Sequence, residues 1–138
     1  MTDKTLDATI DLIVVGAHLS GMPLNRELVD LGGQLVAPTR TAPTYRLYQL
    51  PGGGPRKPGL LRVAEGGAAI EVEIWSLDVA AFGAFVAAIP QPLGIGTVLL
   101  EDGSSAKGFL VEAVAVTTAR DITSFGGWRG FVTSEAAA

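Results

Sequence analysis

The feature that most constrains the fold is a short apolar run near the N-terminus, residues 10–15, interrupted only by Asp11. A run of this length that is rich in isoleucine and valine is typical of a buried strand. The chain then turns at Gly16 into a loop, and Asn25 is a suitable N-cap for a following helix. A strand, a glycine-containing loop and a helix N-terminus expose backbone N–H groups and the positive end of a helix dipole. We therefore expect a small anion to bind beyond the end of this strand.

His18 lies in the middle of this loop and is the only histidine of the chain. Imidazole is the side chain whose ordinary pKa allows proton exchange near neutral pH. If N–H groups of residues 19–21 hold a carboxylate, His18 is placed to act as a general acid beside it. The simpler alternative is that a lone histidine after a strand is a loop residue held by local hydrogen bonds. Ser20 has no base at a readable spacing, so a serine nucleophile is not expected.

Composition excludes several classes of function. The 138 residues suffice for one domain with a real core, and 48% apolar against 17% charged residues excludes a disordered chain. The net charge of −4, with no basic stripe, argues against a nucleic-acid partner. The absence of cysteine excludes disulfides and thiolate ligands and fits a cytoplasmic location. One histidine and two strand carboxylates are too few for a metal site, so we assign neither a metal nor a cofactor.

The two ends and the most apolar segment bear on targeting. Residues 1–9 contain acidic side chains and no apolar core, which predicts a flexible leader and not a signal peptide. Residues 133–138 are expected to be a flexible tail, and the whole of residues 1–138 is expected to form one domain. The apolar run of residues 79–89 is too short to span a bilayer, so no membrane partner is expected.

Periodicity and turn signals predict the other elements. A helix should run from Asn25 to the Gly32–Gly33 pair, and a buried helix should begin at Asp78 as N-cap and end before Pro90. The expected strands, with a turn at residues 91–96, are residues 34–38, 45–50, 59–64, 68–77, 97–101 and 106–116. Residues 119–132 are expected to fold back as a lid or an edge. These connections favour an α+β domain with a curled, mainly antiparallel sheet, and closure into a small barrel stays open.

Several side chains are candidates for binding an anionic substrate. Residues 51–59 form the main irregular segment and contain Lys57; a surface hairpin is the simpler interpretation, and whether it closes over a site stays open. Lys57, Arg46 and Arg40 are the candidate cations, and the sequence does not rank them. Glu71 and Glu73 share one face of a predicted strand. Such a pair can serve acid–base chemistry or form the solvated face of the strand, and we favour the second role for one of them.

Six segments of the chain together closely resemble the C-terminal domain of allophanate hydrolase. They occur in order and span nearly the whole chain from residue 10 to residue 132, which makes the resemblance specific. The segments are GAHLSGMPLN (residues 16–25), APTYRLY (42–48), KPG (57–59), IEVEIW (70–75), IPQPLGIG (89–96) and DITSFGGWR (121–129).

The resemblance implies a fold and an activity. The fold would be a small, mainly antiparallel β-barrel with flanking helices, similar to γ-glutamylcyclotransferases. The activity would be decarboxylation of N-carboxycarbamate, the second step of allophanate breakdown in urea and s-triazine nitrogen metabolism. His18 matches the family histidine and would be catalytic, and Glu73 takes the place of a glutamate in the cyclotransferases' strand motif. The full set of residues expected to bind the carboxylate-bearing substrate is Leu19, Ser20, Gly21, Met22, Tyr45, Arg46, Lys57 and Glu73.

Two departures from these families matter. The amidase half of allophanate hydrolase is missing, so the chain is either an excised domain or a stand-alone relative with no amidase activity of its own. A second hypothesis therefore stays open, in which the chain is a non-catalytic module that binds or assembles a separate amidase subunit, and a homodimer also stays open. Residues 77–86 keep the Leu-Asp pair that opens the corresponding helix of cyclotransferases, but supply only apolar side chains where those enzymes keep a general-base glutamate, which argues against glutamyl cyclisation.

Overall fold

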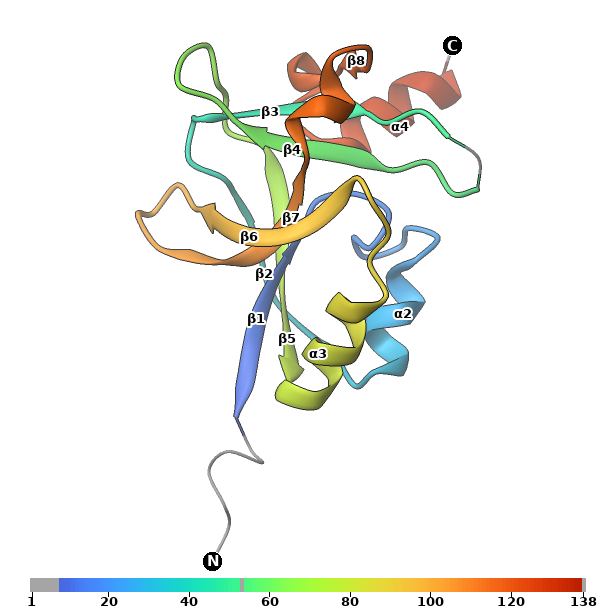
Figure 1. The fold of residues 1–138 in the computed structure, drawn as a ribbon, viewed down its shortest axis with the longest axis vertical. Coiled ribbons are helices and arrows are strands. Elements are labelled where there is room, and N and C mark those ends of the chain that lie inside the picture. Colours follow the sequence, from blue (N-terminus) through green and yellow to red (C-terminus); the bar gives the residue numbers. More distant parts are fainter. Residues whose placement is uncertain (1–7, 53, 138) are drawn as a thin grey trace, which may run out of the picture.

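The computed structural model describes residues 8–52 and 54–137 (Figure 1). Predicted features of residues 1–7, 53 and 138 lie outside the described residues. In chain order the elements are β1 (Thr9–Val14), α2 (Asn25–Asp30), β2 (Gln34–Arg40), β3 (Tyr45–Gln49), β4 (Pro58–Arg62), β5 (Glu71–Asp78), α3 (Val79–Ala87), β6 (Leu93–Leu99), β7 (Ser105–Val111), the 3₁₀ turn η1 (Ala113–Val116), β8 (Arg120–Asp121), the 3₁₀ turn η2 (Thr123–Phe125) and α4 (Trp128–Ala137).

The larger sheet has five strands in the order β2-β5-β1-β7-β6, with β1 at its centre. The apolar run that begins the sequence is buried here, since Leu12, Ile13 and Val14 are at most 1% exposed. β1 pairs antiparallel with β5, where Leu12 lies opposite Trp75, and parallel with β7, where Leu12 lies opposite Lys107. The residues that follow β1 stay buried, since Val15 and Ala17 are each 4% exposed, so the loop after β1 begins at the core.

A second sheet of three strands, in the order β4-β3-β8, lies across one end of the first (Figure 1). Tyr45 at the start of β3 is fully buried and joins the two sheets, because its hydroxyl accepts a hydrogen bond from the Leu99 N–H at 2.9 Å. The α+β class is therefore confirmed. The closed barrel is not shown: among the described strands, the edges of the larger sheet meet only at an isolated bridge between Thr41 and Leu100. The sheet curls, as expected, but keeps an open strand order.

The sequence correctly predicts the N-cap of α3 and the end of α2, but not the N-cap of α2. Asp78 caps α3, since its carboxylate accepts a hydrogen bond from the Ala81 N–H at 2.7 Å. The predicted cap of α2 is wrong. Leu24 occupies the cap position without a side-chain bond, and the Asn25 amide instead donates to the His18 carbonyl at 2.8 Å. Gly32 ends this segment with a φ of 80°, a left-handed conformation that favours glycine.

The largest departures from the predicted boundaries are in β5, β6, β7 and the tail. Residues 93–96, expected as a turn, begin β6 because they pair with residues 108–111 of β7, and residues 113–116, expected as strand, form η1. Strand β5 begins at Glu71, three residues later than expected. Residues 128–137 form α4, so most of the expected flexible tail is helical.

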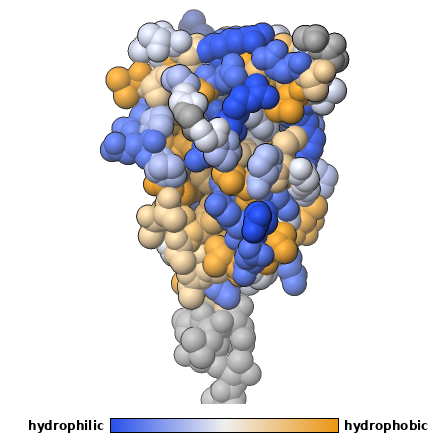
Figure 2. Space-filling view, turned by 90° about the vertical axis from the view of Figure 1, so that its right-hand side faces the viewer, coloured by the Kyte–Doolittle hydropathy of each residue, from blue (hydrophilic) through white to orange (hydrophobic). Residues whose placement is uncertain are grey.

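None of the helices among the described residues is both long and apolar enough to span a membrane. Seen from the side that faces right in Figure 1, hydrophobic and hydrophilic residues are interspersed over the molecule (Figure 2). This is the side on which α2 lies.

Candidate active site

The loop between β1 and α2 is a series of hydrogen-bonded turns. The Leu19 N–H donates to the Gly16 carbonyl at 3.0 Å, the Met22 N–H to the Leu19 carbonyl at 2.9 Å, and the Leu24 N–H to the Ala17 carbonyl at 2.9 Å. Gly21 adopts a φ of 81°, which lets the chain reverse within this short span. The loop therefore holds His18 in one place.

The His18 side chain is mostly buried among aromatic rings and an acid. Its Nε2 lies 2.7 Å from Glu27 Oε1, and the imidazole is 13% exposed. The ring stacks on Phe109 of β7, with centroids 5.3 Å apart, and meets the Phe85 ring of α3 edge-on at 5.0 Å. A carboxylate partner and two ring contacts fix the orientation of an imidazole, which is what a proton donor needs.

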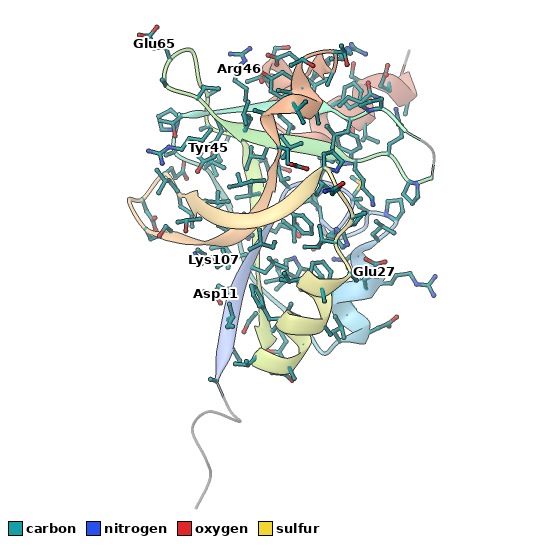
Figure 3. The ribbon with its side chains drawn as sticks, in the orientation of Figure 1. Asp11, Glu27, Tyr45, Arg46, Glu65 and Lys107 are labelled. Carbon is teal, nitrogen blue, oxygen red and sulfur yellow. The ribbon has the colours of Figure 1, made fainter. Side chains whose placement is uncertain are left out.

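His18 opens into a cavity of about 480 Å³ between α2, α3 and the start of β4. Its ionisable lining residues are His18, Glu27 and Lys57, and its other lining residues are Leu24, Leu31, Ala84, Phe85, Ala88, Ile89, Pro90, Leu93 and Phe109. Figure 3 shows Glu27 on the α2 side of the molecule, away from the smaller sheet. The cavity thus combines a few ionisable groups with a mainly apolar wall, the usual composition of a small-molecule site.

Lys57 reaches this cavity because the start of β4 packs tightly on the His18 loop. A Cβ atom at Gly16 would lie 2.2 Å from Pro58 Cδ, so only glycine permits this approach. Lys57 precedes Pro58 directly and lines the cavity together with His18. Within the described part of the chain, Lys57 makes no ion pair. Its ammonium group is therefore available to an anion.

The surroundings of His18 lower its pKa below the usual 6.5. Burial has the largest effect, because it disfavours the charged imidazolium; the hydrogen bond and the charge of Glu27 act in the opposite direction, and the nearby Lys57 charge lowers the pKa further. The imidazole is mainly neutral at pH 7. A bound anion beside it would offset the Lys57 charge and favour protonation.

A second polar cluster fixes the other side of the loop. Glu73 on β5 is 4% exposed, and its Oε1 accepts hydrogen bonds from the Ser20 N–H at 2.8 Å, the Ser20 hydroxyl at 3.0 Å and the Trp75 indole at 3.0 Å. Arg129 on α4 donates to Glu73 Oε2 at 2.9 Å, to Glu71 Oε1 at 3.1 Å and to the Ser20 carbonyl at 2.7 Å. These contacts tie the loop to both β5 and α4.

The charge state of Glu73 follows from this arrangement. Burial alone would raise its pKa, but hydrogen bonds from Ser20, Trp75 and Arg129 outweigh burial and lower the pKa below its usual range. Glu73 is therefore ionised at neutral pH. The Ser20 N–H, one of the groups expected to hold a substrate carboxylate, binds this internal carboxylate instead.

The structure brings together only part of the predicted substrate-binding set. Lys57 lines the cavity with His18, while Tyr45 is buried between the sheets. Arg46 bonds to Asp121 at 2.6 Å and to the Gly66 carbonyl, and Figure 3 shows it at the far end of the molecule from Glu27. Arg40 does not line the His18 cavity.

Sequence reasoning missed three kinds of residue at this site. Glu27 received no role from the sequence, although its spacing places it on one helix face with Leu24 and Leu31. Phe85 and Phe109 gave no signal beyond apolarity. Arg129 lies in one of the segments that carried the family resemblance, but it received no role. Among the described residues, no three His, Cys, Asp or Glu side chains are grouped as a metal site requires.

Comparison with solved structures supports this architecture. The allophanate hydrolase of Kluyveromyces lactis superposes with a TM-score of 0.89 at 40% identity, covering 93% of this chain and 22% of that one. A protein of uropathogenic E. coli superposes with a TM-score of 0.84 at 37% identity, covering 91% of this chain and 97% of that one. A γ-glutamyl cyclotransferase shares the fold alone, with a TM-score of 0.56 at 10% identity.

Comparison with protein sequences leads to the same family. The urea amidolyase of Saccharomyces cerevisiae is 42% identical over 133 residues, which is 94% of this chain but only about 7% of that relative's length. The family described as the allophanate hydrolase C-terminal domain matches residues 10–133. A family match over nearly the whole chain, together with the α+β fold shared with these relatives, confirms the resemblance drawn from the sequence segments: this chain belongs to the allophanate hydrolase C-terminal domain family.

Proposed function

We propose that this chain decarboxylates N-carboxycarbamate in the breakdown of allophanate, with His18 as the proton donor. The observation that carries the proposal is that His18, Glu27 and Lys57 line one cavity, with His18 paired to Glu27 at 2.7 Å. Membership of the family and the relatives named allophanate hydrolase and urea amidolyase support allophanate metabolism as the setting.

The chemistry asks for one proton and for charge neutralisation. In the proposed step the bond between nitrogen and one carboxyl carbon breaks, and its electron pair stays on nitrogen. Nitrogen takes a proton from the His18 imidazolium, the carboxyl carbon leaves as CO₂, and carbamate is the product. General acid catalysis of this kind typically contributes about 10²–10⁴-fold. Glu27 would hold the imidazole in place and stabilise its protonated form.

The balance of charge in the cavity favours departure of one carboxylate. With His18 protonated, the three ionisable lining groups sum to one positive charge, whereas the substrate carries two negative charges. Lys57 would bind the carboxylate that remains, and the other would face the apolar wall formed by Phe85, Phe109 and Leu93. Conversion of that carboxylate to neutral CO₂ removes the unmatched charge, so the site binds the transition state better than the ground state.

The decisive experiment supplies N-carboxycarbamate from the amidase domain of an allophanate hydrolase and measures CO₂ release with this chain added. We expect acceleration by the wild-type chain and a loss of about 10²-fold or more with His18→Asn. A Glu65→Gln variant, changed on the exposed far end of the molecule, serves as the control and should match wild type. Equal acceleration by His18→Asn, or none by folded wild-type chain, would refute the proposal.

A second candidate function is a module that binds a separate amidase subunit. It is favoured by the short span of the match within longer relatives and by three exposed apolar side chains on α2 and the edge strand β2. Val29, Leu35 and Val36 are 54%, 46% and 54% exposed. Stable co-purification with an amidase, lost in a Leu35→Ser, Val36→Ser variant, would support this role. Failure of the wild-type chain to bind any amidase domain would oppose it.

A further inference from the structure

We propose that the cavity beside His18 accepts a carboxylate that bears a short aliphatic substituent, with the aliphatic chain lying between α2 and α3. The inference goes beyond the function proposed above, since it names a class of ligand for the same site. It rests on that function for the position of the carboxylate beside Lys57 and His18.

The size of the cavity exceeds what N-carboxycarbamate needs. Its volume of about 480 Å³ falls within the range of about 300–1,000 Å³ found for pockets that hold drug-sized ligands. N-carboxycarbamate is only two carboxylates on one nitrogen atom. Most of the cavity would stay unfilled with that substrate bound, and apolar walls around an unfilled space lose the contacts that a ligand chain supplies.

The lining of the cavity separates a polar end from an apolar channel. On α2 and its two cap positions, Leu24, Glu27 and Leu31 share one face, and Leu31 lies one turn beyond Glu27, about 6 Å along the helix axis. Opposite, Ala84 and Ala88 of α3 and its C-cap present two small side chains one turn apart. In this proposal the alkyl chain occupies the space between these small alanines and the leucine.

Charge at the polar end selects a monocarboxylate. Glu27 is already paired with His18, while Lys57 makes no ion pair with the described residues. With His18 protonated, the net charge of these three groups is balanced by one carboxylate. The ligand class that fits this charge and this lining is a short aliphatic monocarboxylate.

The test titrates the chain with acetate, butyrate and hexanoate, using calorimetry and the NMR signal of the single histidine. We expect the dissociation constant to fall about fourfold for each added methylene that becomes buried. Ala84→Leu fills the channel and should abolish this dependence on chain length, with Ala88→Leu as a second filling variant. Ala87→Leu, the same exchange at an exposed position of α3 outside the cavity, should leave the dependence unchanged. Circular dichroism verifies that each variant is folded.

The outcomes separate this inference from the proposed function. Equal, weak binding of all three acids would overturn the aliphatic channel and leave the carboxylate position intact, as would a series unaffected by both filling variants. Binding that strengthens with chain length in a chain that fails to decarboxylate N-carboxycarbamate would refute the proposed function alone. Absence of binding by any acid would overturn the inference at its carboxylate end.

Discussion

The Ser20 N–H donates a hydrogen bond to Glu73 Oε1 at 2.8 Å, so a protein carboxylate occupies the loop amide that a substrate carboxylate was expected to use. Ser20 follows His18 by two residues, and the same serine is held through its hydroxyl by Glu73 and through its carbonyl by Arg129. The larger sheet and helix α4 therefore orient the loop together. The charge of an anionic ligand would be bound by Lys57 and His18.

Glu73→Gln should destabilise the fold at neutral pH by about 2–4 kcal/mol, because a buried carboxylate with four hydrogen bonds is replaced by a neutral amide. The folded-state pKa of Glu73 is lowered, so its stabilising effect is complete above the ordinary value of 4.5 and is lost as the pH falls through the folded-state pKa. Urea denaturation should therefore show a gap between wild type and variant that narrows below pH 4.5. Exposed Glu65→Gln is the matched control, and a similar loss there would contradict this assignment.

Arg129→Met should lower kcat for decarboxylation by about 10–100-fold with little change in KM, because it releases the loop that orients His18 without touching the cavity. Arg129→Lys keeps the charge but not the bidentate geometry, and should recover part of the loss. Broadening of the His18 imidazole signal by NMR would distinguish a loosened loop from general destabilisation. An unchanged kcat in a folded Arg129→Met chain would exclude this role.

The pKa of His18 should move in opposite directions in two variants. The chain has a single histidine, so its imidazole signal in NMR is unambiguous. Wild type should titrate below pH 6.5, Glu27→Gln lower still, and Lys57→Met higher, because Glu27 favours the charged form and Lys57 disfavours it. Equal pKa values of His18 in all three proteins would contradict the proposed effects of Glu27 and Lys57.

The same lowered pKa makes stability depend on pH. Since folded His18 binds protons more weakly than unfolded His18, its contribution is complete above pH 6.5 and falls as the pH drops from 6.5 toward the folded-state pKa. Thermal melts of wild type should show this decline, and melts of His18→Asn should lack it.

The pH dependence of activity has a different origin, because general acid catalysis by the free enzyme requires the imidazolium. The rate should therefore decrease as the pH rises past the lowered pKa of His18.

Gly16→Ala should destabilise the fold and impair the site, because an added Cβ would meet the ring of Pro58, where only a displacement of the start of β4 relieves the clash. Gly83→Ala is a matched exchange in α3, where nothing lies within 4 Å of the new atom. Alanine there should stabilise the helix by about 0.5–1 kcal/mol. Chemical denaturation of both variants tests the contrast, and a neutral Gly16→Ala would show that this close approach is dispensable.

The sequence correctly predicted those features of the fold that depend only on residues adjacent in the chain. The apolar run of β1, the Asp78 cap and the Gly32 stop each follow from a few adjacent residues. Residues 93–96 contain two glycines, which favours a turn, yet their pairing with β7 makes them part of a strand. Helix α4 contains Gly130 and opens with an aromatic residue, so its propensity is weak. Burial of Trp128 and Phe131 stabilises it.

The candidate site shows the same division. His18 and Lys57 were predicted from loop position and from the resemblance, and they line one cavity. The pairing of His18 with Glu27 depends on the turn that the loop makes before α2, and the bonding of Arg129 to Glu73 depends on where α4 packs. Neither distance is encoded in spacing along the chain. Periodicity predicts which face of a helix or strand a residue occupies. It does not predict which residue from a distant segment contacts that face.

The parallel pairing of β1 with β7 has a consequence for how the chain folds. Leu12 lies beside Lys107, so the central strand gains its second neighbour only from a segment near the other end of the chain. Contacts between such distant segments require a large loss of loop-closure entropy before any favourable contact energy is gained, which slows folding. During synthesis the His18 loop leaves the ribosome before Phe109 and Arg129 do. The cavity therefore matures late, and a nascent chain halted before β7 would hold His18 without the ring on which it stacks.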